Sequence, residues 1–301
     1  MTWKRVATAL VLIPVVVGLV LFTPTWVVAI ATAAITVLAL WEYFALGDAI
    51  GHRAYRLWTI ACSLLFVFVS LQYARPVYIE FVFPGESGSH TSLHPISFSP
   101  FREIAISLHS SEGVFFLFVL GLTALTLWTR RPLVEALPAA GISSSALMLV
   151  SFPLSFAARL HAIPWNGPKL LLFALVLTWA GDTTAYFVGR SIGKHPLAPH
   201  LSPKKTWEGT VASMVGSLIV GCVFSFWLRM PWVHLLAMAA VGNVAGQIGD
   251  LLESAYKRSA GVKDSGGLLP GHGGVLDRID ALILCIPVIW YYLVLVNPAV
   301  R

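Results

Sequence analysis

Nine apolar runs, separated by polar connections, constrain the fold of this chain more than any other feature. A soluble domain carries about a quarter charged residues, whereas 11% of these 301 residues are charged and the mean hydropathy is +0.79. Because a helix satisfies its own backbone hydrogen bonds in lipid, each run is expected to span a membrane as a helix. We therefore predict an all-α, polytopic integral membrane protein. The expected spans are 6–23, 26–46, 57–72, 113–129, a fifth within 133–160, 169–189, 207–228, 232–256 and 278–296.

The chain is expected to form one membrane domain, 1–301, with two parts. Residues 1–168 hold the N-terminal spans and a polar loop, 73–112, which contains no constellation of catalytic type. Residues 169–301 hold the spans and loops with most of the candidate chemistry. Within the fifth span, Pro138, Pro153 and a run of three serines predict an irregular helix.

The distribution of Lys and Arg predicts the orientation. With the N-terminus in the cytosol, cytosolic segments hold 14 of the 20 Lys and Arg residues, and the opposite side holds six. We expect a multi-pass protein of the inner (cytoplasmic) membrane, with nine spans and an extracytoplasmic C-terminus. The candidate site then lies near the cytosolic face.

The stretch 243–280 concentrates polar chemistry in this apolar chain. Five of its polar residues fall on one helical face, and such a stripe must face a cavity or a partner because lipid offers no hydrogen bonds. The residues of this stripe are Asn243, Gln247, Asp250, Ser254 and Lys257. Five glycines follow between positions 266 and 274, which indicates tight turns or a close approach to a ligand.

Four acids lie inside or at the edges of predicted spans, where such groups are candidates for a functional site. They are Asp182, Asp250, Asp277 and Asp280. Carboxylates near a basic loop suit Mg²⁺, which takes oxygen ligands and shares phosphate oxygens with its substrate. The alternative is that these acids form structural ion pairs with Arg190, Lys257 or Arg278.

About a dozen positions of this stretch match a known signature at its spacing. They are Ser254, Lys257, Arg258, Lys263, Asp264, Pro270, Gly271, His272, Gly273, Gly274, Asp277, Arg278 and Asp280. Two upstream segments extend the match: Gly181-Asp182-Thr183-x-Ala185-Tyr186 and Ser202-Pro203-Lys204-Lys205-Thr206-x-Glu208-Gly209. Together they resemble the phosphatidate cytidylyltransferases, also called CDP-diacylglycerol synthases. The resemblance covers the C-terminal half well, and the N-terminal half only as a pattern of hydrophobic spans.

The resemblance implies an enzyme of phospholipid biosynthesis that converts CTP and phosphatidic acid to CDP-diacylglycerol and pyrophosphate. It also implies Mg²⁺ dependence, a second cation site, contact with membrane lipid and a homodimer; no nucleic-acid partner is expected. Two alternatives stay open. One is a CTP-dependent lipid kinase, which would release CDP, and the other is a polytopic transporter with the buried acids as an ion relay.

The resemblance also implies roles for individual residues. Asp250 and Asp277 are expected to hold the metal and to act in catalysis, together with Lys263 and His272. For Asp182 and Asp280, metal binding and the orientation of a neighbour are both open. The expected substrate contacts are Ser202, Lys204, Lys205, Thr206, Glu208, Ser254, Lys257, Arg258, Gly273, Gly274 and Arg278. For the bases, an ordinary positive-inside excess is the alternative. Glu42 either has a functional role or reaches the membrane interface, and the second interpretation is preferred.

Overall fold

The computed structural model describes residues 2–72, 110–128, 132–164, 166–228, 230–267 and 273–296, and this part of the chain is all-α apart from one short hairpin. Its helical segments coincide with the nine predicted spans, so the predicted fold class is confirmed. The helices are α1 (Thr2–Phe22), α2 (Thr25–Ala49), α3 (Arg56–Gln72), α5 (Ser111–Trp128), η1 (Leu133–Glu135), α6 (Ala136–Ala146), η2 (Leu147–Ser151), α7 (Phe152–His161), α8 (Gly167–Ile192), α9 (Trp207–Leu228), α10 (Trp232–Ser259) and α11 (Leu276–Val296).

Seven of these helical stretches are long and apolar enough to cross a membrane, counting 133–161 as one and considering only the described residues. The helix Arg56–Gln72 and the part Leu12–Phe22 of α1 are shorter apolar helices. Large apolar side chains such as Phe226 and Leu295 are 87% and 78% exposed, as expected for a surface that faces lipid. The chain is therefore a multi-pass membrane protein.

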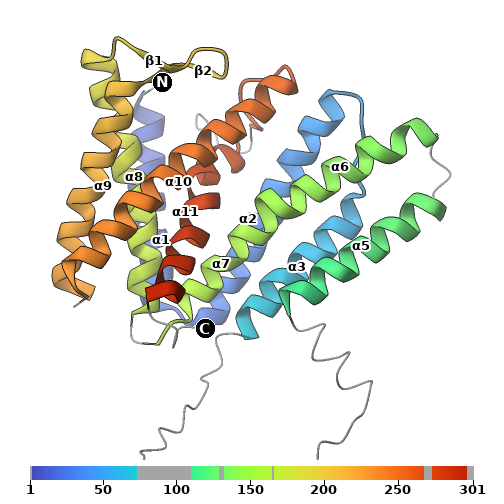
Figure 1. Cartoon of the computed structure of the whole chain (residues 1–301), viewed down its shortest axis with the longest axis horizontal. Coiled ribbons are helices and arrows are strands. Elements are labelled where there is room, and N and C mark those ends of the chain that lie inside the picture. Colours follow the sequence, from blue (N-terminus) through green and yellow to red (C-terminus); the bar gives the residue numbers. More distant parts are fainter. Residues whose placement is uncertain are drawn as a thin grey trace, which may run out of the picture.

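The helices form one bundle in which α1 begins and α11 ends at opposite ends (Figure 1). The nine predicted spans, an odd number, would require this arrangement. The end of α2, the last turns of α10 and a β-hairpin lie together at the end of the bundle where α1 begins (Figure 1). Polar side chains from the two halves of the sequence therefore share one end of the molecule.

The fifth span is irregular, as its prolines predict. It begins with the 3₁₀ turn η1, continues as α6, widens into the π-helical turn η2 and ends as α7. Pro153, in the first turn of α7, has no backbone N–H to donate to the preceding turn, and such a gap in the hydrogen-bond ladder favours a local π-turn. Pro138 lies in the first turn of α6, where a missing N–H is tolerated.

Small residues let α8, α9, α10 and α11 pack closely. A Cβ at Gly249 of α10 would lie 2.5 Å from the carbonyl oxygen of Asp280 in α11, and one at Gly216 of α9 would lie 2.6 Å from the Oγ1 of Thr184 in α8. Such contacts replace the hydrophobic effect as the force that joins helices in lipid. They also bring the backbones that carry Asp182, Asp250 and Asp280 near one another.

Two predicted loops differ in part from the structure. The connection 190–206 was predicted as a polar loop, but α8 continues to Ile192 and an antiparallel hairpin follows, β1 (Pro196–Ala198) with β2 (Ser202–Thr206). The loop 73–112 is shorter than predicted, because α5 begins at Ser111. Its residues 73–109 lie outside the described part of the chain.

Candidate functional site

A pocket of about 310 Å³ lies between α8, the hairpin, α9 and α10. It gathers acids and bases from elements that are distant in the sequence. Its polar lining includes Asp182, Lys204, Lys205, Thr206, Gln247 and Asp250. Because groups of both charges meet in a hollow, this pocket is the best candidate for binding an anionic ligand together with a cation.

The polar stripe of α10 forms one wall of this pocket and packs on α9. Asn243 donates to the hydroxyls of Ser213 and Ser217, each at 2.8 Å, and Gln247 donates to the side-chain oxygen of Asn243 at 2.6 Å. One turn later, Asp250 forms an ion pair with Lys205 of β2. The stripe predicted from helical spacing therefore faces a partner helix and the pocket, as expected.

Carboxylates from three helices converge beside Asp250. Asp182 of α8 lies within electrostatic range of Asp250, Lys205 and Arg278. Asp280 of α11 lies within range of Asp250, Asp182 and Glu253. The described residues contain no group of three or more His, Cys, Asp or Glu side chains placed to hold a metal ion by themselves. A cation at this point would therefore need ligands from a substrate or water as well.

A second ionic cluster lies one turn further along α10. The ammonium of Lys257 forms an ion pair with Glu253 and donates to Asp277 Oδ1 at 2.6 Å. The Glu253 side chain is 6% exposed, and its carboxylate is paired with the Lys257 ammonium. One lysine thus lies between two buried acids. Sequence reasoning gave no role to Glu253, although its i,i+4 spacing to Lys257 is a usable signal.

Both carboxylate oxygens of Asp277 already have hydrogen-bond partners within the protein, which its predicted role as a metal ligand does not require. Its Oδ2 accepts hydrogen bonds from the backbone N–H of Ser265 (3.0 Å) and of Gly274 (2.8 Å), while Oδ1 holds Lys257. Gly273 has φ +79°, and a Cβ there would lie 2.8 Å from Asp277 Oδ2. The glycines of this loop therefore fit around a protein carboxylate.

The predicted substrate contacts on the hairpin divide into two groups. Lys204 is exposed and Lys205 lines the pocket, so both ammonium groups can reach a ligand. Thr206 also lines the pocket, and its hydroxyl accepts from Gly209 N at 3.2 Å. Glu208, in the first turn of α9, accepts from His195 Nδ1 at 2.7 Å and so supports the hairpin. Ser202 begins β2.

The remaining predicted residues lie around the end of α10 and the start of α11. Arg258 donates to the carbonyl oxygens of Leu201 and Val262, both at 3.3 Å, which ties α10 to the hairpin turn. Ser254 is half-buried on α10, whereas Lys263 and Arg278 are exposed. His272 lies outside the described residues.

Glu42 corrects a prediction. It was expected to reach the membrane interface, but the residue is only 6% exposed. Its carboxylate accepts hydrogen bonds from Val275 N (2.9 Å), Leu276 N (2.8 Å) and Ser265 Oγ (3.1 Å). The interpretation failed because these partners lie more than 200 positions away, beyond the range of any local pattern.

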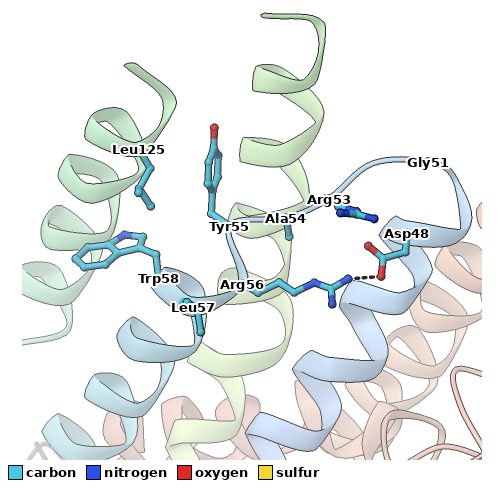
Figure 2. A pocket seen from close by; sticks show the side chains of 9 residues that line it. All are labelled: Asp48, Gly51, Arg53, Ala54, Tyr55, Arg56, Leu57, Trp58 and Leu125. Carbon is cyan, nitrogen blue, oxygen red and sulfur yellow. Dashed lines mark hydrogen bonds and ion pairs between the residues drawn. The ribbon is translucent and has the colours of Figure 1, made fainter. Parts of the chain in front are cut away.

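A larger pocket, of about 950 Å³, lies between the α2–α3 turn and α5. Figure 2 shows Arg53, Arg56 and Trp58 around it, with the Arg56 guanidinium bound to Asp48. Asp48 is the single acid of this lining, and it is already paired. The smaller pocket is the stronger candidate because it combines two acids with two lysines.

Comparisons with known proteins agree with the resemblance found in the sequence. The model of the Cytidylyltransferase family matches residues 3–86 and 88–296. The phosphatidate cytidylyltransferase of Haemophilus influenzae is 32% identical over 300 residues, which cover 96% of this chain and 97% of that protein. That of Bacillus subtilis is 38% identical over 157 residues, or 52% of this chain and 58% of that protein. That of Staphylococcus haemolyticus is 43% identical over 132 residues, or 43% of this chain and 50% of that protein.

Proposed function

The chain belongs to the cytidylyltransferase family, and from this we infer that it is a membrane nucleotidyltransferase that makes CDP-diacylglycerol from CTP and phosphatidic acid. The observation that carries the inference is similarity to the Haemophilus influenzae enzyme over 97% of that protein's length. The lipid-kinase and transporter alternatives are not favoured, because the relatives bear the name of the cytidylyl-transfer reaction. The reaction is a step of phospholipid biosynthesis.

In this reaction an ionised phosphate oxygen of phosphatidic acid attacks the α-phosphorus of CTP. A new P–O–P bond forms, the bond from the α-phosphorus to the bridging oxygen of the β-phosphate breaks, and pyrophosphate leaves. The attacking oxygen is already an anion, so the protein need not remove a proton from it. Its contribution is to align two anions that repel each other and to neutralise charge on the leaving group.

We propose that the lysines of β2 hold the triphosphate. Lys205 is bound to Asp250, and both groups line the pocket. An incoming triphosphate gives the Lys205 ammonium a more highly charged partner, so Lys205 exchanges Asp250 for a phosphate oxygen. This exchange frees the Asp250 carboxylate at the moment when substrate binds.

The residues of the site fit a bound Mg²⁺. That ion is usually held by one or two carboxylates together with water and substrate phosphates, so a ready-made cage of three acids is not required. Asp250 and Asp277 would hold it, with Asp182 and Asp280 as further acids near Asp250. Asp277 Oδ1 would then exchange Lys257 for the ion, while Oδ2 keeps its two backbone hydrogen bonds. A second cation is also expected. The crowding of Asp182, Asp250, Asp280 and buried Glu253 supports this fit. When bound, the ion would polarise the α-phosphate and neutralise the departing pyrophosphate.

The enzymatic assignment is tested with purified protein in nanodiscs, given CTP labelled in the cytosine ring and phosphatidic acid. The expected products are a labelled lipid and pyrophosphate, in equal amounts. Labelled CDP as the product would identify a lipid kinase instead. Absence of any lipid-dependent turnover would overturn the proposal.

We further propose that the protein lies in the inner membrane as a homodimer, with its N-terminus and the pocket in the cytosol. The excess of Lys and Arg in the predicted cytosolic segments supports this orientation. A reporter fused after Arg301 should be extracytoplasmic, and a cysteine placed in 190–206 should react only from the cytosol. Native mass spectrometry should give twice the monomer mass; the reverse labelling pattern or a monomer mass would refute the corresponding part.

A further inference from the structure

The carboxylate of Glu42 in α2 lies among hydrogen-bond donors of residues 265 and 275–276, which are distant in the sequence. Its Oε1 accepts from Val275 N, and its Oε2 accepts from Leu276 N and from the Ser265 hydroxyl. Leu276 is the first residue of α11, where the free N–H groups of the helix favour a negative charge. One acid from the N-terminal half therefore holds the start of the last helix.

Two loop glycines pack directly on this carboxylate. A Cβ at Gly266 would lie 2.6 Å from Glu42 Oε1, and one at Gly274 would collide with Glu42 Oε2 and with the Ser265 hydroxyl. A Cβ at Gly267, in contrast, would meet nothing within 4 Å. Glycine at positions 266 and 274 therefore leaves the space that the Glu42 carboxylate occupies.

The same part of the chain also binds Asp277, because hydrogen-bond donors to Asp277 alternate with donors to Glu42. Ser265 gives its hydroxyl to Glu42 and its N–H to Asp277 Oδ2. Gly274 N binds Asp277, and the next N–H, that of Val275, binds Glu42. Residues 265 and 274–276 are therefore held between two carboxylates, and movement away from one disturbs their bonds to the other.

We propose that Glu42 is a positioning residue for the cytidylyl-transfer site: it fixes residues 265–266 and 274–276 and, through them, the carboxylate of Asp277. The inference rests on the proposed function for its catalytic consequence, but not for its structural one. Glu42 touches no reacting atom. Its role is to keep the Asp277 carboxylate oriented toward Lys257 and the N-terminus of α11.

The structural part is tested by thiol labelling. Val275 is 8% exposed, so a Val275→Cys thiol is shielded while residues 274–276 are held. In a Cys222→Ser background, which removes the exposed native cysteine, Glu42→Gln should raise the maleimide labelling rate at position 275 at least tenfold. Glu42→Asp keeps the charge and should raise it less. Asp48→Asn, on the same helix and paired with Arg56 instead, should leave it unchanged.

The catalytic part is tested in parallel, without the reporter cysteine. Glu42→Gln should lower kcat about tenfold or more, change the KM for CTP by less than about threefold, and shift half-maximal activity to higher Mg²⁺. Glu42→Asp should recover part of kcat. An unchanged labelling rate would overturn the inference whatever the activity, and faster labelling with normal kcat would show that the Glu42 contacts do not serve catalysis.

A second pair of variants keeps the test decisive if Glu42→Gln does not fold. Gly266→Ala pushes a methyl group into the Glu42 carboxylate, whereas Gly267→Ala adds the same group in open space. The first should speed labelling and lower kcat, and the second should behave as wild type. Equal labelling rates and equal kcat in the two alanine variants would contradict the role of Glu42 as a positioning residue. If the protein made no CDP-diacylglycerol at all, the proposed function would fail, yet the labelling difference between the alanine variants would still stand.

Discussion

The helices before Gly167 and those after it bury polar groups in different ways. In α2 to α7, contacts between neutral groups are common: the hydroxyls of Ser63 and Ser151 meet at 2.6 Å, and Tyr43 donates to Ser145 at 2.9 Å. The Arg56–Asp48 ion pair of this first region is partly exposed. In α8 to α11, the neutral contacts of Asn243 are joined by ion pairs at the pocket and at buried acids. The ion pairs there are Lys205 with Asp250, and Lys257 with Glu253 and Asp277.

This difference indicates which side chains of the protein can exchange a protein partner for a bound ligand. Two neutral hydroxyls satisfy each other's hydrogen bonds inside a membrane protein and gain little from a charged ligand. A lysine held by a carboxylate can pass to a phosphate, and the carboxylate it leaves can bind a cation. Glu42 is the bridge between the regions, because it is an acid of the first that binds backbone of the second.

The largest effect is expected from the acids of the second region. Asp250→Asn and Asp277→Asn keep side-chain size but remove charge, so the fold should survive while kcat falls roughly 10³-fold or more. Initial rates against Mg²⁺ concentration, beside thermal unfolding in detergent, measure this, and raised Mg²⁺ should rescue either variant poorly. Asp48→Asn is the control. A folded Asp277→Asn protein with near-normal turnover would show that Asp277 only stabilises its loop and takes no part in catalysis.

The next effect is on stability. Lys257→Met removes the one ammonium that Glu253 and Asp277 share, and should lower the free energy of unfolding by about 3 kcal/mol, because breaking a buried ion pair leaves charges uncompensated. Lys263→Met, at an exposed lysine, should change it by less than about 0.5 kcal/mol. Denaturant titration in detergent compares the two. A stable Lys257→Met protein with a raised KM for CTP would assign Lys257 to substrate binding alone.

A smaller effect is expected at the hairpin. Lys205→Ala removes one charge-assisted hydrogen bond to phosphate, worth about 1.5–3 kcal/mol, so the KM for CTP should rise about 10- to 100-fold. Lys194, exposed and ahead of the hairpin, provides the control Lys194→Ala. If both variants raised KM equally, general attraction of anions by the basic surface would explain the lysines.

The smallest effect is expected in the first region. Ser63→Ala removes the contact with Ser151 and the hydrogen bond to the Thr59 carbonyl oxygen, and should lower stability by about 1 kcal/mol or less. Turnover should not change. A tenfold fall in kcat with unaltered stability would mean that the neutral contacts of the first region also shape the active site.

The sequence alone was enough to predict the helical membrane fold and the class of reaction. Apolar run lengths predict the helices, prolines predict the irregular fifth span, and 3.6-residue spacing predicts the polar stripe of α10. The reason is that hydrophobicity and helical spacing are local, and the membrane imposes helices on every apolar run. The matched signature in 254–280 identified the family for the same reason, because its residues are close in sequence.

Only the tertiary structure decided which side chains meet. It assigned Glu42 to the N–H groups of Val275 and Leu276, more than 230 positions away, and gave two loop glycines a protein carboxylate as their neighbour. It also joined Lys205 of the hairpin to Asp250, and placed Glu208 as a support of the hairpin. Such pairings depend on how helices cross in three dimensions, and no periodicity within one helix encodes the partner on another.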